Sequence, residues 1–129
     1  MSSGKKTITS FTDLHTWQVG HSLALDVYEL TKKFPDAEQF SLTSQMRRAA
    51  ISITSNIAEG FSRSTVKDRV HFYIMSLGSL TELQNQTLLS RDIGYITSED
   101  FDPIAKKSVV VHKLLKGLIK STKVNTHDS

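Results

Sequence analysis

The sequence predicts an all-α protein, an antiparallel four-helix bundle whose helices run up, down, up and down. Apolar residues recur every three or four positions over four long segments, and only two prolines and six glycines interrupt the chain. The β-branched residues do not alternate with polar ones, as they would in half-buried strands. Four helices of roughly 20 to 30 residues with short connections pack most simply as antiparallel neighbours.

The first helix is predicted over about residues 13–33, where apolar residues recur at helical spacing. Phe34-Pro35 ends it, because the residue before a proline is disfavoured in the helical region. Residues 36–42 then form a polar connector with room for one turn of helix. The apolar positions of this helix are Leu14, Trp17, Ala24, Val27, Tyr28 and Leu30.

The second helix is predicted over residues 43–63, with Thr43 as its N-cap. Its apolar residues fall within an arc of about 120° on a helical wheel, which predicts a well-defined core face. These residues are Leu42, Met46, Ala49, Ala50, Ile53, Ile57, Gly60 and Phe61.

The third helix is predicted from the N-cap Ser64 to Ile93, with Gly94 as its C-cap. The break before it is short enough to be a kink instead of a loop. Its expected core residues are Val66, Val70, Tyr73, Ile74, Leu77, Leu80 and Leu88. Phe72, Met75, Leu83 and Leu89 are apolar residues outside that arc.

The fourth helix is predicted to begin between Thr97 and Pro103 and to end near Lys123. The segment TSED at residues 97–100 resembles a capping box, while Asp102-Pro103 offers a second start with proline in the first helical position. The chain is then one domain at residues 11–123. Residues 1–10 and 124–129 are polar and are predicted to be flexible.

Composition excludes several classes of protein. The 129 residues include no cysteine, which excludes disulfides, thiolate metal sites and a cysteine nucleophile. No apolar run approaches the roughly 18 residues of a membrane span, and the N-terminus lacks a signal-peptide core. We therefore expect a cytoplasmic protein with no membrane partner. The net charge of +3 does not by itself indicate nucleic-acid binding.

Several segments resemble one bacterial family of four-helix bundles, first noted in intervening sequences inside large-subunit ribosomal RNA genes. The most distinctive is QMRRAAISITSNIAEG at residues 45–60, followed by GSLTEL at residues 78–83. FTDLHTWQ at residues 11–18 resembles the opening signature of the family, and Phe34-Pro35, Glu38 and Leu42-Thr43 resemble its connector. The sequence departs from the usual pattern at Thr54, Thr87 and Leu77. The resemblance spans about residues 11–120.

The resemblance implies a left-handed bundle that assembles into a homopentamer with a central channel. The molecular function of most family members is undefined. A distant basic relative, the accessory variability protein of diversity-generating retroelements, binds nucleic acid and a reverse transcriptase. The resemblance therefore adds a reverse transcriptase as a candidate partner. The motif residues carried over from the family are Trp17, Asn56, Glu59, Gly60 and Glu82.

The second helix has an unusual solvent side. Its bases are Arg47, Arg48 and Arg63, its one acid is Glu59, and small uncharged residues fill most of the remainder. Exposed helix faces usually carry more Lys and Glu. Ile51 and Ala58 on this side are therefore candidate contacts with another subunit; the alternative is that the helix is merely well covered within one bundle.

The motif residues indicate structural roles instead of catalysis. Asn56, Glu59 and Glu82 are not accompanied by a nucleophile, a metal ligand set or an oxyanion donor. We expect Glu59 to pair with Arg48 or Arg63, and Asn56 to cap or bridge helices through buried hydrogen bonds. The five histidines show no i,i+4 pair, so we expect no metal, no cofactor and no enzymatic activity. Trp17 is interpreted as a core anchor, and Gly60 and Gly78 as sites of tight helix packing.

The fourth helix carries the sharpest charge pattern. Residues 104–123 contain six lysines and no acid. All of them except Lys107 fall within about 100° on a helical wheel; these five are Lys106, Lys113, Lys116, Lys120 and Lys123. A solvated face and the helix dipole explain the C-terminal lysines but not the absence of acids. His112 is expected on the opposite, core-facing side. Val110 and Leu114 form a second apolar strip, which is a candidate oligomer contact.

Two hypotheses of function follow. The first is a non-enzymatic homo-oligomeric scaffold or accessory protein that binds RNA or DNA through the five lysines, with Arg47, Arg48 and Arg63 as additional contacts. The alternative is an oligomeric structural or protein-interaction module whose positive face only aids solubility.

Overall fold

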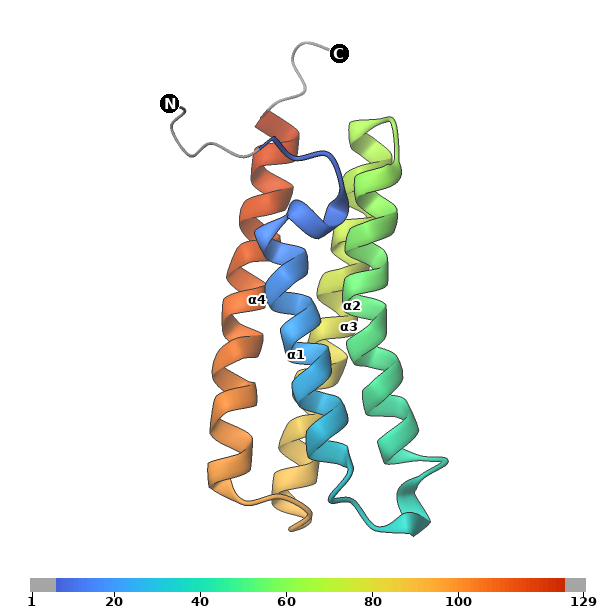
Figure 1. The fold of residues 1–129 in the computed structure, drawn as a ribbon, viewed down its shortest axis with the longest axis vertical. Helices are drawn as coiled ribbons and strands as arrows, with labels where there is room; N and C mark the ends of the chain where they lie inside the picture. Colours follow the sequence, from blue (N-terminus) through green and yellow to red (C-terminus); the bar gives the residue numbers. More distant parts are fainter. Residues whose placement is uncertain (1–6, 125–129) are drawn as a thin grey trace.

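The computed structural model describes residues 7–124, which form four α-helices (Figure 1). These are α1 (His15–Thr31), α2 (Leu42–Ser62), α3 (Val66–Asp92) and α4 (Ser98–Val124). The 3-10 helices Phe11–Asp13 and Asp36–Glu38 precede α1 and α2, and no strand occurs in the described range. The predicted all-α fold is confirmed. None of the described helices is long and apolar enough to cross a membrane.

The helices are antiparallel neighbours around one core. α1 packs against α2 and α4, and α3 also packs against α2 and α4. α2 and α4 are therefore diagonal to each other across the core, as Figure 1 shows with α4 on the left and α2 on the right. The outer sides of α2 and α4, whose sequences are the most distinctive, therefore lie on opposite sides of the bundle.

The core is built from one apolar stripe of each helix. The predicted core face of α2 is confirmed, with seven of its eight residues buried and Phe61 half-buried. Side chains that are completely inaccessible to solvent include Leu23, Val27, Met46, Ile53, Ile57, Leu80, Val111 and Leu115. Trp17 is half-buried against this core and packs between Phe11 and His21, with ring centroids 5.4 and 4.7 Å away. These contacts support its interpretation as an anchor.

The core stripe of α3 differs from the sequence prediction. Ile74, expected in the core, is 52% exposed, and Leu88 is also exposed, whereas Leu83, expected outside, is 0% exposed. The α3 stripe includes polar residues that hydropathy does not mark: Ser76, Gln86, Thr87 and Ser90 are buried. The three hydroxyls among them donate to backbone carbonyls, which offsets the cost of their burial. His112 of α4, expected on the core side, is exposed.

The helix ends follow the predicted signals with small shifts. α2 begins at Leu42, one residue before the predicted cap Thr43, because the Glu38 carboxylate accepts hydrogen bonds from the Ser41 hydroxyl and the Leu42 amide. Arg63–Thr65 form a true turn, not a kink, and Thr65 is the N-cap of α3 in place of Ser64.

In the loop between α3 and α4, Gly94 has φ +87°, as a glycine after a helix C-terminus often has. Thr97 caps α4 by accepting a hydrogen bond from the Asp100 amide, and the Asp100 carboxylate accepts one from the Thr97 amide. The predicted capping box at residues 97–100 is therefore present.

The two predicted packing glycines have different surroundings. A Cβ on Gly60 would lie 2.7 Å from the buried Tyr73 ring, so this glycine permits the close approach of α2 and α3. A Cβ on Gly78 would meet nothing within 4 Å, so Gly78 does not permit a close helix contact within the described part of one chain. The predicted flexible termini lie mostly outside the described residues; within residues 7–10, Thr9 and Ser10 donate hydrogen bonds to Asp13.

Candidate nucleic-acid interface

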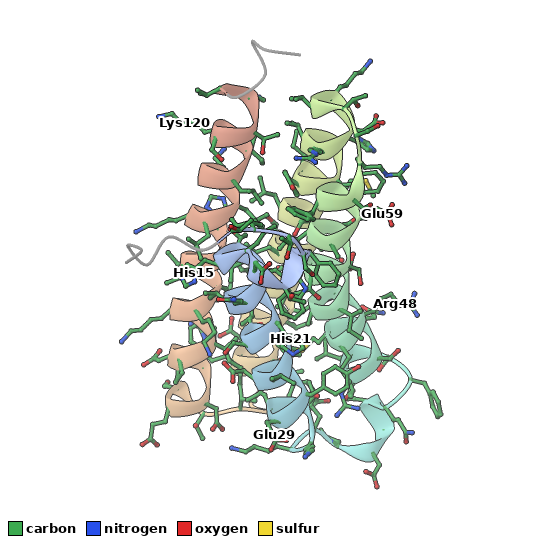
Figure 2. The ribbon with its side chains drawn as sticks, turned by 45° about the horizontal axis from the view of Figure 1, so that its top comes forward. His15, His21, Glu29, Arg48, Glu59 and Lys120 are labelled. Carbon is green, nitrogen blue, oxygen red and sulfur yellow. The ribbon has the colours of Figure 1, made fainter. Side chains whose placement is uncertain are left out.

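The α4 lysine face consists of Lys106, Lys113, Lys116, Lys120 and Lys123, and all five side chains are exposed. They point outward because Ile104, Ser108, Val111 and Leu115 occupy the core side of α4. Lys106, Lys113, Lys116 and Lys120 form no ion pair with another described residue. Figure 2 shows Lys120 on the outer side of α4, away from α2. The positive charge of these four lysines is therefore available to an external anion.

Lys107 is different from the other α4 lysines, as its place on the helical wheel predicts. Its ammonium lies 2.7 Å from the Asp26 carboxylate and 2.7 Å from the Ser22 hydroxyl of α1. Lys107 therefore joins α4 to α1 and does not belong to the exposed face.

The acids of α4 are Glu99 and Asp100 in its first turn, where they complement the helix dipole, and Asp102 directly after that turn. Asp100 there accepts a hydrogen bond from Lys33 at 2.8 Å. This hydrogen bond lowers the pKa of the Asp100 carboxyl. The acid-free lysine face starts after this turn.

An apolar groove borders the lysine face on the α3 side. It has a volume of about 280 Å³, and exposed Leu88 and Val109 form its rim. The Gln84 amide donates to the Ser108 hydroxyl at 3.1 Å inside the groove. The face thus combines positive charge with apolar surface.

The three candidate arginines do not extend the lysine face, since they lie on or beside α2, diagonal to α4. Arg47 donates to the Thr31 hydroxyl at 2.8 Å and stacks 4.6 Å from the centre of the Tyr28 ring. Arg63 pairs with Glu59 at 2.8 Å and stacks on Phe72 at 4.7 Å. Both are engaged within the bundle.

Arg48 makes no hydrogen bond or ion pair with another described residue, and its side chain is exposed. Figure 2 shows it on the outer side of α2, opposite the side where Lys120 lies. One copy of the chain therefore does not bring Arg48 and the lysine face onto one surface.

The motif residues have structural contacts. The pairing of Glu59 with Arg63 is one of the two expected pairings. Asn56 neither caps a helix nor crosses to one directly: its amide donates to the Ser52 carbonyl at 2.9 Å and to the Ser52 hydroxyl at 3.1 Å. That hydroxyl lies 2.8 Å from the Ser79 hydroxyl of α3, so Asn56 supports a polar link between α2 and α3. Glu82 is exposed and accepts a hydrogen bond from Gln86 at 3.4 Å.

The candidate oligomer contacts fall on two separate surfaces. Ile51 is 46% exposed and lines a groove of about 720 Å³ along the outer side of α2, with Ala58 half-buried further along that helix. Val110 is exposed and Leu114 half-buried on the diagonal helix α4. No group of three His, Asp or Glu side chains that could hold a metal ion occurs within residues 7–124.

Sequence reasoning missed Phe40, which is 91% exposed at one end of the α2 groove. The available signal was an aromatic residue inside the polar connector of residues 36–42. Tyr28 was expected in the core but lies at the edge of the same groove, under Arg47.

Comparisons with known proteins agree with this architecture. A solved structure of a protein with unknown function from the S23 ribosomal protein family of Bacteroides thetaiotaomicron VPI-5482 is 24% identical to this chain. The match covers 81% of this chain and 95% of that one, with a TM-score of 0.75, so the two share the four-helix fold. No curated protein matches. The model of the 23S rRNA-intervening sequence protein family matches residues 12–117, and the chain therefore belongs to that family.

Proposed function

We propose that the protein is a non-enzymatic, homo-oligomeric scaffold or accessory protein that binds nucleic acid through the α4 lysine face. Structured RNA is the expected ligand. The observation that carries this proposal is the charge arrangement of α4. It has five exposed lysines on one side, four of which make no ion pair within residues 7–124, and residues 104–123 contain no acid. Lysines in this arrangement are suited to phosphate groups spaced along a nucleic-acid backbone.

The expected contacts are to phosphates, with weak sequence preference. The described exposed surface of α4 carries no Phe, Tyr or Trp beside the lysines on which bases could stack, and its exposed ring is the imidazole of His112. One copy offers little charge for tight binding, so repetition of the face in an oligomer would supply avidity. The family resemblance favours a pentamer. Light scattering coupled to size exclusion at micromolar concentration tests this, and a single 14.4 kDa species would contradict assembly.

The binding test compares two double variants that remove equal charge. Lys113→Gln/Lys116→Gln should weaken binding of a structured RNA hairpin about tenfold and reduce the salt slope by about 2 per copy, because each lysine releases roughly one counterion. The matched control is Lys32→Gln/Lys33→Gln, which removes two charges at the end of α1, where both lysines pair with acids. The control should leave binding within about twofold.

Fluorescence anisotropy between about 50 and 300 mM salt measures both the affinity for RNA and the salt slope. Circular dichroism and light scattering should show unchanged helicity and particle size in both variants. If wild type shows no salt-sensitive binding at about 50 mM salt, the nucleic-acid role is wrong. The alternative, a protein-interaction module, would then be favoured, since Phe40 and Ile51 in the α2 groove are exposed apolar residues.

A further inference from the structure

The outer side of α3 carries an exposed strip with the spacing of a helix–helix contact. Its members alternate at four and three residues, and every one is exposed. This α3 outer strip consists of His71, Met75, Gly78, Glu82, Asn85, Leu89 and Asp92. Such spacing keeps one side of a helix against a partner helix over several turns. Met75 is 43% exposed, and a Cβ on Gly78 would meet open space, so nothing in the described chain covers the strip.

The α2 groove has the same spacing on its helix. Ser44, Arg48, Ile51, Ser55 and Ala58 follow one another at four and three residues along the outer side of α2. The exposed ring of Phe40 lies at the end of the groove where α2 begins. The residues that line the groove include two arginines and no acid.

The two surfaces are complementary in charge. The α3 outer strip contains Glu82 and Asp92 and no lysine or arginine. Asp92 pairs with Arg91 at 2.9 Å, which leaves Glu82 as the unpaired acid of the strip. Glu82 makes no ion pair with another described residue, and neither does Arg48 in the α2 groove. An acidic apolar strip and a basic apolar groove on one chain, both uncovered, are suited to contact between copies.

We propose that the α3 outer strip of one copy docks antiparallel into the α2 groove of a second copy, with Glu82 opposite Arg48. The inference rests on the homo-oligomer of the proposed function and names the two surfaces that meet in it.

Side-chain sizes match in this register. Placing Glu82 opposite Arg48 brings Ile51 opposite the open surface at Gly78, Met75 opposite Ser55, and Leu89 near Phe40. A parallel alignment would place Ile51 opposite Asn85 and leave Gly78 facing Ser44. A parallel alignment would also place Leu89 opposite Ser55, but the exposed Ile51 would then meet a polar amide. The antiparallel arrangement places both Ile51 and Met75 against small residues, which allows the two helices to interdigitate.

The arrangement has a geometric consequence. α2 and α3 are antiparallel within one chain, so an antiparallel contact between α2 of one copy and α3 of the next aligns all bundles in the same direction. Such a head-to-tail contact closes into a cyclic assembly when its rotation permits. The proposed contact uses residues of α2 and α3, and none of the five lysines of the α4 lysine face belongs to it.

The experiment pairs variants at neighbouring positions of α3. Met75→Glu lies in the strip, whereas Ile74→Glu places the same charge on an exposed residue outside it. Arg48→Glu and Glu82→Arg reverse the proposed ion pair, and Lys106→Glu is the reversal control on α4. We expect Met75→Glu, Arg48→Glu and Glu82→Arg each to raise the half-assembly concentration at least about tenfold. Ile74→Glu and Lys106→Glu should leave it within about twofold.

Mixing distinguishes a contact between copies from one within a chain. Separately purified Arg48→Glu and Glu82→Arg proteins should form mixed assemblies when combined, because every contact between unlike copies then pairs an acid with a base. A ring of five keeps one contact between like copies, so recovery in such a ring should be partial. Mass photometry measures the particle sizes, and circular dichroism confirms that each variant is folded.

If wild type assembles but Met75→Glu and Arg48→Glu leave its size unchanged, the assigned surfaces are wrong while the oligomer of the proposed function stands. If the mixture forms no assembly beyond what either variant forms alone, the pairing is also overturned. If wild type is a monomer, both the oligomer and this inference fail, whereas the lysine-face binding test is unaffected.

Discussion

The α2–α3 side and the α1–α4 side of the bundle are joined by different kinds of contact. α2 and α3 approach closely through small groups: Gly60 lies against Tyr73, and the Ser76 hydroxyl donates to the Ile53 carbonyl at 2.7 Å. α1 and α4 are joined at their rim by long charged side chains, Lys107 to Asp26 and Lys33 to Asp100.

The difference indicates how well each side of the bundle tolerates substitution. Close packing through small residues makes the α2–α3 contact intolerant of added volume. Long side chains at a hydrated rim tolerate substitution, because solvent replaces most of what is lost. α4 can therefore carry a dense lysine face without weakening the core beneath it.

The largest expected effect separates two helical glycines. Gly60→Ala should destabilise the fold by about 1 to 3 kcal/mol, because the new methyl group would overlap the Tyr73 ring and crowd the Arg69 carbonyl. A Cβ added at Gly117 of α4 would meet nothing within 4 Å. Gly117→Ala should therefore stabilise the fold by up to about 1 kcal/mol, because alanine has the higher helix propensity. Urea unfolding monitored by circular dichroism measures both changes. Equal effects at the two positions would contradict the contrast between the two sides.

A smaller effect is expected from the ion pair between α1 and α4. Lys107→Met should lower the unfolding free energy by about 0.5 to 1 kcal/mol, since Lys107 and Asp26 are both partly exposed. Lys106→Met is the matched control, because the neighbouring Lys106 side chain is exposed and makes no ion pair with a described residue. The difference between the two variants should shrink in about 0.5 M salt. A difference that persists at high salt would indicate packing instead of charge.

The smallest effect concerns pH. Hydrogen bonds from Ser41, then Tyr95, lower the pKa of Glu38 from 4.5, and the hydrogen bond to Glu38 at 2.6 Å raises the pKa of Tyr95 above 10.0. The contribution of ionised Glu38 to the stability of the fold is present above pH 4.5 and is lost as the pH falls through the lowered pKa. The Tyr95 contribution is present below pH 10.0 and is lost as the pH rises through the raised pKa.

Tyr95→Phe should therefore lower Tm slightly and by a constant amount between about pH 5 and 9. The difference from wild type should disappear in stronger acid. Thermal unfolding across this range checks it. Asp100, whose pKa Lys33 also lowers, is present in both proteins, so its contribution to the pH dependence cancels in the difference between them. A Tm difference that is unchanged in acid would mean that the Tyr95 ring, and not its hydroxyl, is responsible.

Sequence patterns predicted elements where apolar periodicity was strong. The α2 core face was confirmed from Met46 to Ile57, and the capping box at Thr97 marked the start of α4. The same reasoning separated Lys107 from the other lysines of α4. α3 was less predictable, because its buried stripe contains Ser76, Thr87 and Ser90, whose hydroxyls bond to carbonyls instead of contributing hydropathy.

The candidate site also has one part that the sequence predicts and another that depends on the tertiary structure. The sequence by itself determined the four-helix class and the acid-free lysine pattern, because both depend on spacing along one chain segment. Only the tertiary structure decided that Arg47 and Arg63 are engaged within the bundle, that Arg48 lies away from the lysines, and that Phe40 borders a groove. Those outcomes depend on which helices are adjacent and which are diagonal. Periodicity indicates that a helix has an inner side, but the identity of its neighbours is a property of the assembled bundle.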